Sequence, residues 1–184
     1  MKKLFLGMFL SSLAVVPMAS GAADKAPKKV LIVYYSMTGN TDYIAQKLQK
    51  KTGADMFRLE TVKPYPKGDN EFPKKERESG KLPDLKKLPD NLGSYDIILV
   101  GTPVWWYSAS NPVQSFLKQA DFKGKKMAAF STHGGGLGKT FSDMKAQAKN
   151  AVFIDGGLDF YKPRQDSEER VDQAIDEWLA NVMK

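Results

Sequence analysis

Two short segments of the chain are apolar at nearly every position, and this pattern limits the fold more than any other feature. The segments cover residues 30–35 (VLIVYY) and 96–101 (DIILVG). A strand with one face in water alternates apolar and polar residues, whereas a parallel strand covered by helices on both faces is apolar throughout. The two segments therefore predict central strands of an α/β fold.

The rest of the chain supplies the alternation of strands and helices that such a fold needs. Further strands are predicted at residues 54–62, 126–131 and 151–155. Helices are predicted at residues 41–51, 112–119 and 137–149, and after the N-cap residue Ser167. Residues 63–92 are polar and rich in proline, with a short helix expected at residues 74–79. This order indicates a mostly parallel sheet, in which ligands bind at the carboxyl ends of the strands.

The loop after the first predicted strand is rich in hydrogen-bonding groups. It reads Ser36-Met37-Thr38-Gly39-Asn40-Thr41 and leads into a predicted helix. Free backbone N–H groups and the positive end of the helix dipole suit a phosphate there, and Gly39 lets the backbone approach it. The loop contains no Lys or Arg, so we expect it to hold a phosphate rather than transfer one. The alternative is an ordinary capped turn, which needs only one hydroxyl group.

The loop after residues 96–101 contains three consecutive aromatic residues. It begins Thr102-Pro103-Val104-Trp105-Trp106-Tyr107. Rings at the end of a buried strand suit stacking against a flat conjugated ligand. Because the side chains of adjacent residues in an extended chain point in opposite directions, we expect one tryptophan to pack inward and the other to face a ligand.

The loop after residues 126–131 is rich in glycine. It contains His133-Gly134-Gly135-Gly136 and, further on, Gly138-Lys139-Thr140. The last three residues resemble the end of a P-loop, but the position that requires the first glycine is His133, so the P-loop hypothesis fails. We expect the glycines to let backbone amides approach the edge of a ring. His133 is the single histidine of the chain, and it is either a ligand contact or a loop residue that bonds to the backbone.

Taken together, the three loops resemble those of flavodoxins, in particular the short-chain flavodoxin-like proteins of bacteria. The stretches that carry the resemblance are YSMTGNT, GTPVWW and THGGGLG, and it spans residues 30–158. It implies a flavodoxin-like three-layer sandwich, with a five-stranded parallel sheet of order 2-1-3-4-5, and one non-covalent FMN. It implies neither a catalytic residue nor a metal ligand.

The resemblance also assigns cofactor contacts by position. The implied FMN-binding residues are Ser36, Met37, Thr38, Gly39, Asn40 and Thr41 for the phosphate, Thr102, Pro103, Val104, Trp105, Trp106 and Tyr107 for the ribityl chain and ring, and His133, Gly134, Gly135 and Gly136 for the ring edge.

The chain departs from familiar flavodoxins in three respects. Tyr107 stands where relatives often have glycine, whose peptide can reorient toward a reduced flavin. Residues 151–160 leave no room for the insertion that long-chain flavodoxins carry in the fifth strand. Familiar electron-shuttle flavodoxins are acidic and cytosolic, whereas this chain has a formal net charge of +7. Their usual partners are therefore not expected to serve this chain.

The first residues have the pattern of a secretory signal peptide. Two lysines precede an apolar run at residues 4–16, which proline and small residues follow. The run is shorter than the roughly 20 residues that cross a bilayer, so we expect cleavage and no stable membrane anchor. We predict a signal peptide at residues 1–22, a polar leader at residues 23–29 and a flavodoxin-like FMN-binding domain at residues 30–184. The mature protein would be periplasmic or secreted.

Composition narrows the classes of partner and site. Cleavage after residue 22 removes two lysines and no acidic residue, so the formal net charge falls from +7 to +5. The lysines are scattered along the chain, whereas nucleic-acid binding needs a concentrated basic patch with aromatic residues. The lack of cysteine and the single histidine exclude disulfides, thiolate metal centres and histidine-rich metal sites.

Three functions remain open from the sequence. The leading hypothesis is electron transfer through FMN outside the cytoplasm, with redox proteins or a small electron acceptor as partners. The second is an FMN-dependent NAD(P)H:quinone-type reductase, which would need an open face of the ring. The third is a non-redox binding protein on the same fold.

Overall fold

The computed structural model describes residues 28–66, 68–69 and 71–184. The predicted signal peptide and most of the predicted polar leader lie outside the described residues. The strands are β1 (Val30–Tyr34), β2 (Asp55–Arg58), β3 (Ile97–Trp105), β4 (Ser108–Ala109), β5 (Lys126–His133), β6 (Val152–Phe153) and β7 (Leu158–Tyr161). The helices are α1 (Asn40–Thr52), α2 (Glu71–Glu78), α3 (Asn111–Gln119), α4 (Thr140–Gln147) and α5 (Glu168–Val182), with 3₁₀ turns η1 (Leu92–Ser94) and η2 (Pro163–Gln165). No helix in this described part is long and apolar enough to span a membrane.

The parallel sheet has the order β2-β1-β3-β5-β6, which confirms the predicted flavodoxin-like order 2-1-3-4-5. The five predicted positions of the sheet are all present, and the described residues form seven strands because one position is divided and a short strand is added. The fifth position holds two short strands, β6 and β7, which both pair with β5. Between them lies Gly156 with φ +85°, a left-handed conformation that interrupts the extended chain. The remaining strand, β4, lies outside this order and pairs antiparallel with the end of β3.

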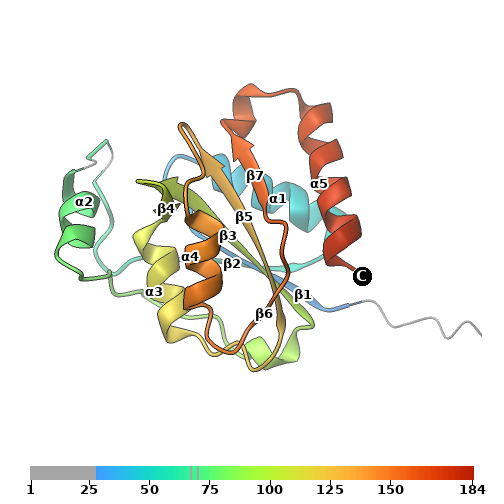
Figure 1. Cartoon of the computed structure of the whole chain (residues 1–184), viewed down its shortest axis with the longest axis horizontal. Coiled ribbons are helices and arrows are strands. Elements are labelled where there is room, and N and C mark those ends of the chain that lie inside the picture. The colour runs from blue at the N-terminus through green and yellow to red at the C-terminus, as the bar shows by residue number, and fades with distance from the viewer. Residues whose placement is uncertain (1–27, 67, 70) are drawn as a thin grey trace, which may run out of the picture.

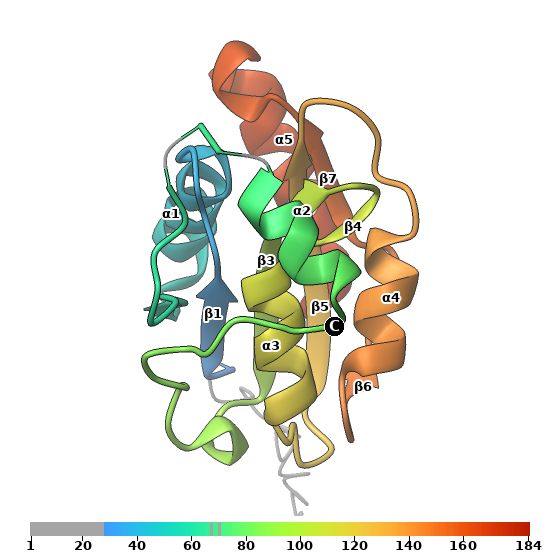
Figure 2. The same ribbon diagram turned by 90° about the vertical axis from the view of Figure 1, so that its left-hand side faces the viewer.

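The sheet lies between two layers of helices, with α1 and α5 on one face and α3 and α4 on the other (Figures 1 and 2). It separates two apolar cores. Along β1, Ile32 packs toward α1 and α5, and its neighbour Val33 packs toward α3 and α4. Both are fully buried, as expected for a strand that is apolar on both faces. Phe130 of β5 covers Gly101 of β3, its partner in the register. A Cβ atom on Gly101 would lie only 2.1 Å from the Phe130 ring, so the glycine makes room for it.

Several predicted boundaries are wrong. Strands β3 and β5 run on to Trp105 and His133, so the first residues of the second and third predicted loops belong to strand ends. The second strand ends at Arg58, because the chain then leaves the sheet edge and Thr61 pairs with Leu85 instead. The short helix begins at Glu71, where the Asp69 carboxylate accepts hydrogen bonds from the first backbone N–H groups. The helix predicted at residues 137–149 covers only Thr140–Gln147, because Gly138 has φ +57° and keeps the preceding loop out of the helix.

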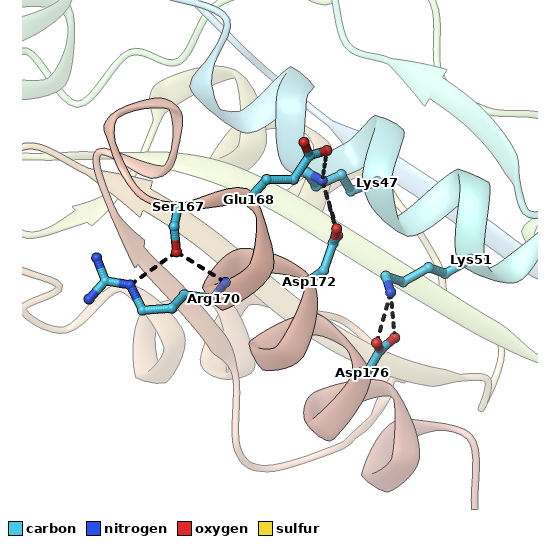
Figure 3. A network of polar contacts seen from close by, with 7 residues as sticks. All are labelled: Lys47, Lys51, Ser167, Glu168, Arg170, Asp172 and Asp176. Carbon is cyan, nitrogen blue, oxygen red and sulfur yellow. Dashed lines mark hydrogen bonds and ion pairs between the residues drawn. The ribbon is translucent and has the colours of Figure 1, made fainter.

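Helices α1 and α5 lie side by side and are joined by ion pairs (Figure 3). Lys47 of α1 lies 2.8 Å from Glu168 and 3.0 Å from Asp172 of α5. Lys51 lies 2.7 Å from Asp176, one turn further along. These contacts fix the start of α5, and with it the preceding turn η2, against the same helix that begins at the first loop.

Candidate functional site

The three loops singled out in the sequence meet at the carboxyl ends of adjacent strands. The first and third loops are joined by a hydrogen bond of 2.9 Å between the hydroxyls of Thr41 and Thr132. The second and third are joined by the Lys139 backbone N–H, which donates to the Tyr107 carbonyl over 2.8 Å. Residues far apart in sequence thus lie together at the carboxyl ends of β1, β3 and β5.

In the first loop, the polar side chains divide into two groups. The Ser36 hydroxyl is buried and accepts from the Gly39 backbone N–H over 3.2 Å, and Thr41 is buried against Thr132. Thr38 is exposed, and the Asn40 amide donates to its hydroxyl over 3.4 Å. Gly39 has φ +89°, which turns the chain into the N-terminus of α1. Two side chains therefore hold the turn, and two remain available to a ligand.

Cations surround this loop, although it contains none. The Arg58 guanidinium donates to the Ser36 carbonyl over 2.9 Å. The Arg164 guanidinium reaches the Thr38 carbonyl at 3.5 Å from the turn η2. The loop itself has no Lys or Arg, but β2 and η2 bring positive charge to it from distant parts of the sequence. No local motif signals either arginine.

In the second loop, the two tryptophans have different environments. The Trp105 ring packs edge-on against Tyr35 and Tyr65, with ring centroids 5.7 and 5.3 Å apart. Trp106 is 41% exposed and Tyr107 is 67% exposed. One tryptophan packs inward and its neighbour faces outward, as expected. Thr102 is buried and bonds to Ser110 within the loop, while Pro103 and Val104 are partly exposed.

The backbone of this loop is left-handed at two residues that are not glycine. Trp106 has φ +48° and Tyr107 has φ +62°, both in the left-handed region. Glycine reaches this region without strain, whereas other residues need support from their surroundings. The support for Tyr107 is its carbonyl contact with Lys139 and close packing against Gly138.

Helix α2 holds the second loop from the outside and was missed as a part of the site (Figure 2). Its Arg77 guanidinium donates to the Trp105 carbonyl over 2.7 Å, to the Asn111 side-chain oxygen over 3.1 Å and to the Ala109 carbonyl. Burial lowers the pKa of Arg77 below its usual range. The prolines of residues 63–92 suggested a loop, and nothing in that stretch indicates which carbonyl groups Arg77 contacts.

In the third loop, His133 is bound to an acid from β7. Its Nε2 atom lies 2.8 Å from the Asp159 carboxylate, which also accepts a hydrogen bond from the Ser131 hydroxyl. His133 Nδ1 is buried and has no hydrogen-bond partner among the described residues. Gly134 and Gly135 are exposed, and Gly136 lies near the Tyr107 ring. No cluster in the described residues has the three acidic or histidine side chains that a metal site would need.

We expect the folded chain to lose stability above pH 10 because of its buried phenols. Burial raises the pKa of the Tyr35 hydroxyl to about 12, and burial and hydrogen bonds to acids raise the pKa of Tyr34 and Tyr65 as well. Their contribution is fully present below pH 10, where unfolded tyrosine is neutral, and is lost as the pH rises toward the folded values. Urea unfolding between pH 8 and 11 measures it.

The control for this pH dependence is Tyr35→Phe, which should flatten the decline. Tyr161→Phe, at a side chain that is 56% exposed, should leave the decline unchanged. Equal slopes in Tyr35→Phe and the unchanged protein would show that the Tyr35 phenol does not contribute.

The comparisons with known proteins agree with this geometry. The family model described as Flavodoxin matches residues 29–181, which covers the whole sheet and all three loops. The chain belongs to the flavodoxin family. Flavodoxin 1 of Escherichia coli K12 is 29% identical over 103 residues, which cover 54% of this chain and 46% of that protein. This flavodoxin thus spans about half the length of the curated relatives that it matches.

Two solved structures have the same fold as this flavodoxin. A protein of Bacteroides eggerthii, described as a candidate flavoprotein, has a TM-score of 0.71 and 26% identity, over 85% of this chain and 99% of its own. A flavoprotein of Lactobacillus acidophilus in complex with FMN has a TM-score of 0.65 and 23% identity, over 82% of this chain and 98% of its own. Because the Lactobacillus acidophilus protein is only 23% identical to this chain, its likeness shows the fold alone.

Proposed function

We propose that this flavodoxin binds one FMN non-covalently across its three loops and transfers electrons through it outside the cytoplasm. The observation that carries the proposal is the meeting of the three loops at the carboxyl ends of β1, β3 and β5, joined by the Thr41–Thr132 and Lys139–Tyr107 hydrogen bonds. This edge of an open parallel sheet is where nucleotide-like ligands bind. The solved relative in complex with FMN supports the choice of cofactor.

The residues at this edge fit the three parts of FMN. The phosphate fits the N-terminus of α1, where Thr38 and Asn40 are available and Arg164 lies nearby. The flat ring fits against the exposed Trp106 side chain. A polar atom on the ring edge would satisfy His133 Nδ1, a buried atom that has no partner among the described residues.

Bound FMN would supply the electron chemistry, which no side chain of the site can supply alone. The chain's own residues have three tasks. The first loop would hold the phosphate end of the cofactor, and the aromatic side chains of the second loop would contact its ring. In the third loop, Asp159 fixes the His133 ring through Nε2, which leaves Nδ1 to face a ligand.

The proposal also concerns the location of the protein and its redox partners. The signal-peptide pattern of residues 1–22 supports a periplasmic or secreted location. The formal charge of +5 that remains after cleavage favours an acidic redox protein or a small anionic electron acceptor. No feature of the sequence favours nucleic acid as a partner.

The test is to isolate the native protein from the periplasmic fraction and to measure its absorbance spectrum and intact mass. We expect a yellow protein with the flavin spectrum, FMN released on denaturation, and a mass that lacks the first 22 residues. A colourless protein that does not bind added FMN would exclude both redox functions and leave the non-redox binding protein. Flavin with a full-length chain in the cytoplasmic fraction would contradict export.

Two variants check where the ring binds. Trp106→Ala should weaken FMN binding by roughly two- to tenfold, because an aromatic contact contributes about 0.5–1.5 kcal/mol beyond buried area. Val152→Ala removes another exposed apolar side chain, from β6, and should leave FMN binding unchanged.

Steady-state oxidation of NADH or NADPH by the FMN-loaded protein distinguishes a reductase from an electron shuttle. We expect almost no NADH or NADPH oxidation if the protein is an electron shuttle.

A further inference from the structure

We propose that Lys162 and Arg164 bind the phosphate of FMN and so make the site select FMN over riboflavin. The inference rests on the proposed function, since it concerns the same cofactor. Neither residue lies in the three loops, and neither belongs to a motif. Both come from the turn between β7 and α5, at the opposite end of the chain from the first loop.

The geometry places the two cations across from the polar side chains of the first loop. One open cleft of about 580 Å³ is lined by Thr38, Asn40, Gly134, Lys162, Arg164 and Gln165. The Arg164 Nη1 atom lies 3.5 Å from the Thr38 carbonyl oxygen. It would also lie 3.2 Å from a Cβ atom on Gly39, so the guanidinium sits directly against the turn at the start of α1. An anion at this helix N-terminus would therefore meet hydroxyl and amide groups on one side and positive charge on the other.

The positive charge of the pair is not neutralised within the described residues. Neither Lys162 nor Arg164 takes part in an ion pair there. The nearby acids have other partners, since Asp159 binds His133 and Asp166 binds Arg170. A guanidinium without a carboxylate partner presents two parallel N–H donors, which match the oxygens of a phosphate. A phosphate dianion is the ligand chemistry that this arrangement fits.

The surrounding structure holds the pair in place. The Lys162 backbone N–H donates to the His133 carbonyl over 2.9 Å, which ties the turn to the third loop. Directly after the turn, Ser167 caps α5, and Glu168 binds Lys47 of α1 (Figure 3). The backbone that carries both cations is thus fixed on two sides, and only their exposed ends have to be ordered by a phosphate.

The test compares FMN with riboflavin, which lacks the phosphate. Lys162→Gln and Arg164→Gln should each weaken FMN binding by roughly three- to tenfold, as expected for partly exposed charged contacts. Their riboflavin affinity should stay unchanged, and the loss for FMN should shrink in high salt. Fluorescence titration of the apoprotein measures both affinities. Arg164→Lys should restore part of the FMN affinity, because it keeps the charge and loses only the two-pronged geometry.

The matched control is Lys50→Gln, which removes an exposed cation from the last turn of α1, the helix whose first turn faces the cleft. It should change neither the FMN affinity nor the riboflavin affinity.

If the unchanged protein binds FMN and the double variant Lys162→Gln/Arg164→Gln binds it equally well, the inference is wrong and the proposed function stands. If the double variant loses FMN and riboflavin affinity to the same degree, the two residues do not recognise the phosphate. An unchanged protein that binds neither flavin would instead overturn the proposed function.

Discussion

Gly138→Ala is expected to weaken FMN binding at least tenfold, because it forces the second and third loops apart. Gly138 has φ +57°, and a Cβ atom there would lie 2.3 Å from the Tyr107 Cβ and 2.5 Å from its carbonyl oxygen. The left-handed conformation costs about 1–2 kcal/mol for a residue other than glycine. The overlap with fixed backbone adds about 1–3 kcal/mol. Relief of this strain requires movement of the loop that carries Trp106.

The matched control for this substitution is Gly124, which precedes β5 at the end of the sheet opposite to the three loops. Gly124 also has a left-handed backbone, with φ +75°, but a Cβ atom there would have no other atom within 4 Å. Gly124→Ala should therefore bind FMN within a factor of about two of the unchanged protein. Titration with FMN, combined with thermal unfolding of the apoprotein, separates loss of the site from loss of the fold. Equal FMN affinities in the two variants would show that the contact between Gly138 and Tyr107 is not needed for binding.

Phe130→Ala should lower the free energy of unfolding by about 3–5 kcal/mol. Phe130 is fully buried in the centre of the sheet, between β3 and the helices α1 and α5. Its ring fills the space above Gly101, so alanine at position 130 leaves a cavity over a residue that has no side chain to fill it. The loss is a large fraction of the roughly 5–15 kcal/mol that stabilises an ordinary domain. Urea unfolding of the apoprotein measures it.

A double-mutant cycle tests the physical reason. Gly101→Ala alone should destabilise by about 1–3 kcal/mol, because its Cβ would overlap the Phe130 ring. In the double variant the overlap is gone, so the combined loss should be at least about 1 kcal/mol smaller than the sum of the two. Additive losses would mean that the ring and the glycine do not share the space.

The central strands could be predicted from sequence because their burial is uniform. Ile32 and Val33 point to opposite faces, and both faces are covered, so every position had to be apolar. The three loops could be found because each follows such a strand and contains residue types that a turn alone does not require. In these places the local pattern and the global fold follow from the same physical cause.

The rest depends on contacts between distant segments, which leave no local pattern. Arg77 reads as a surface charge of a short polar helix, yet it donates to the carbonyl groups that shape the aromatic loop. Arg164 follows a proline in an unremarkable stretch, and it reaches Gly39 through tertiary contacts: the packing of α5 on α1 and the backbone bond from Lys162 to the third loop. The split of the fifth strand depends on a left-handed glycine, whose conformation composition does not specify.

The ion pairs between α1 and α5 also bear on the order of folding and cofactor binding. The first loop belongs to the start of the folded chain, whereas Lys162, Arg164 and the helix that holds them belong to its end. In the proposed export, a chain that is still crossing the membrane would have the first loop but not the cations that face it. If Lys162 and Arg164 bind the phosphate as proposed, full retention of FMN would require the last helix to have docked, and cofactor loading would report the completion of folding.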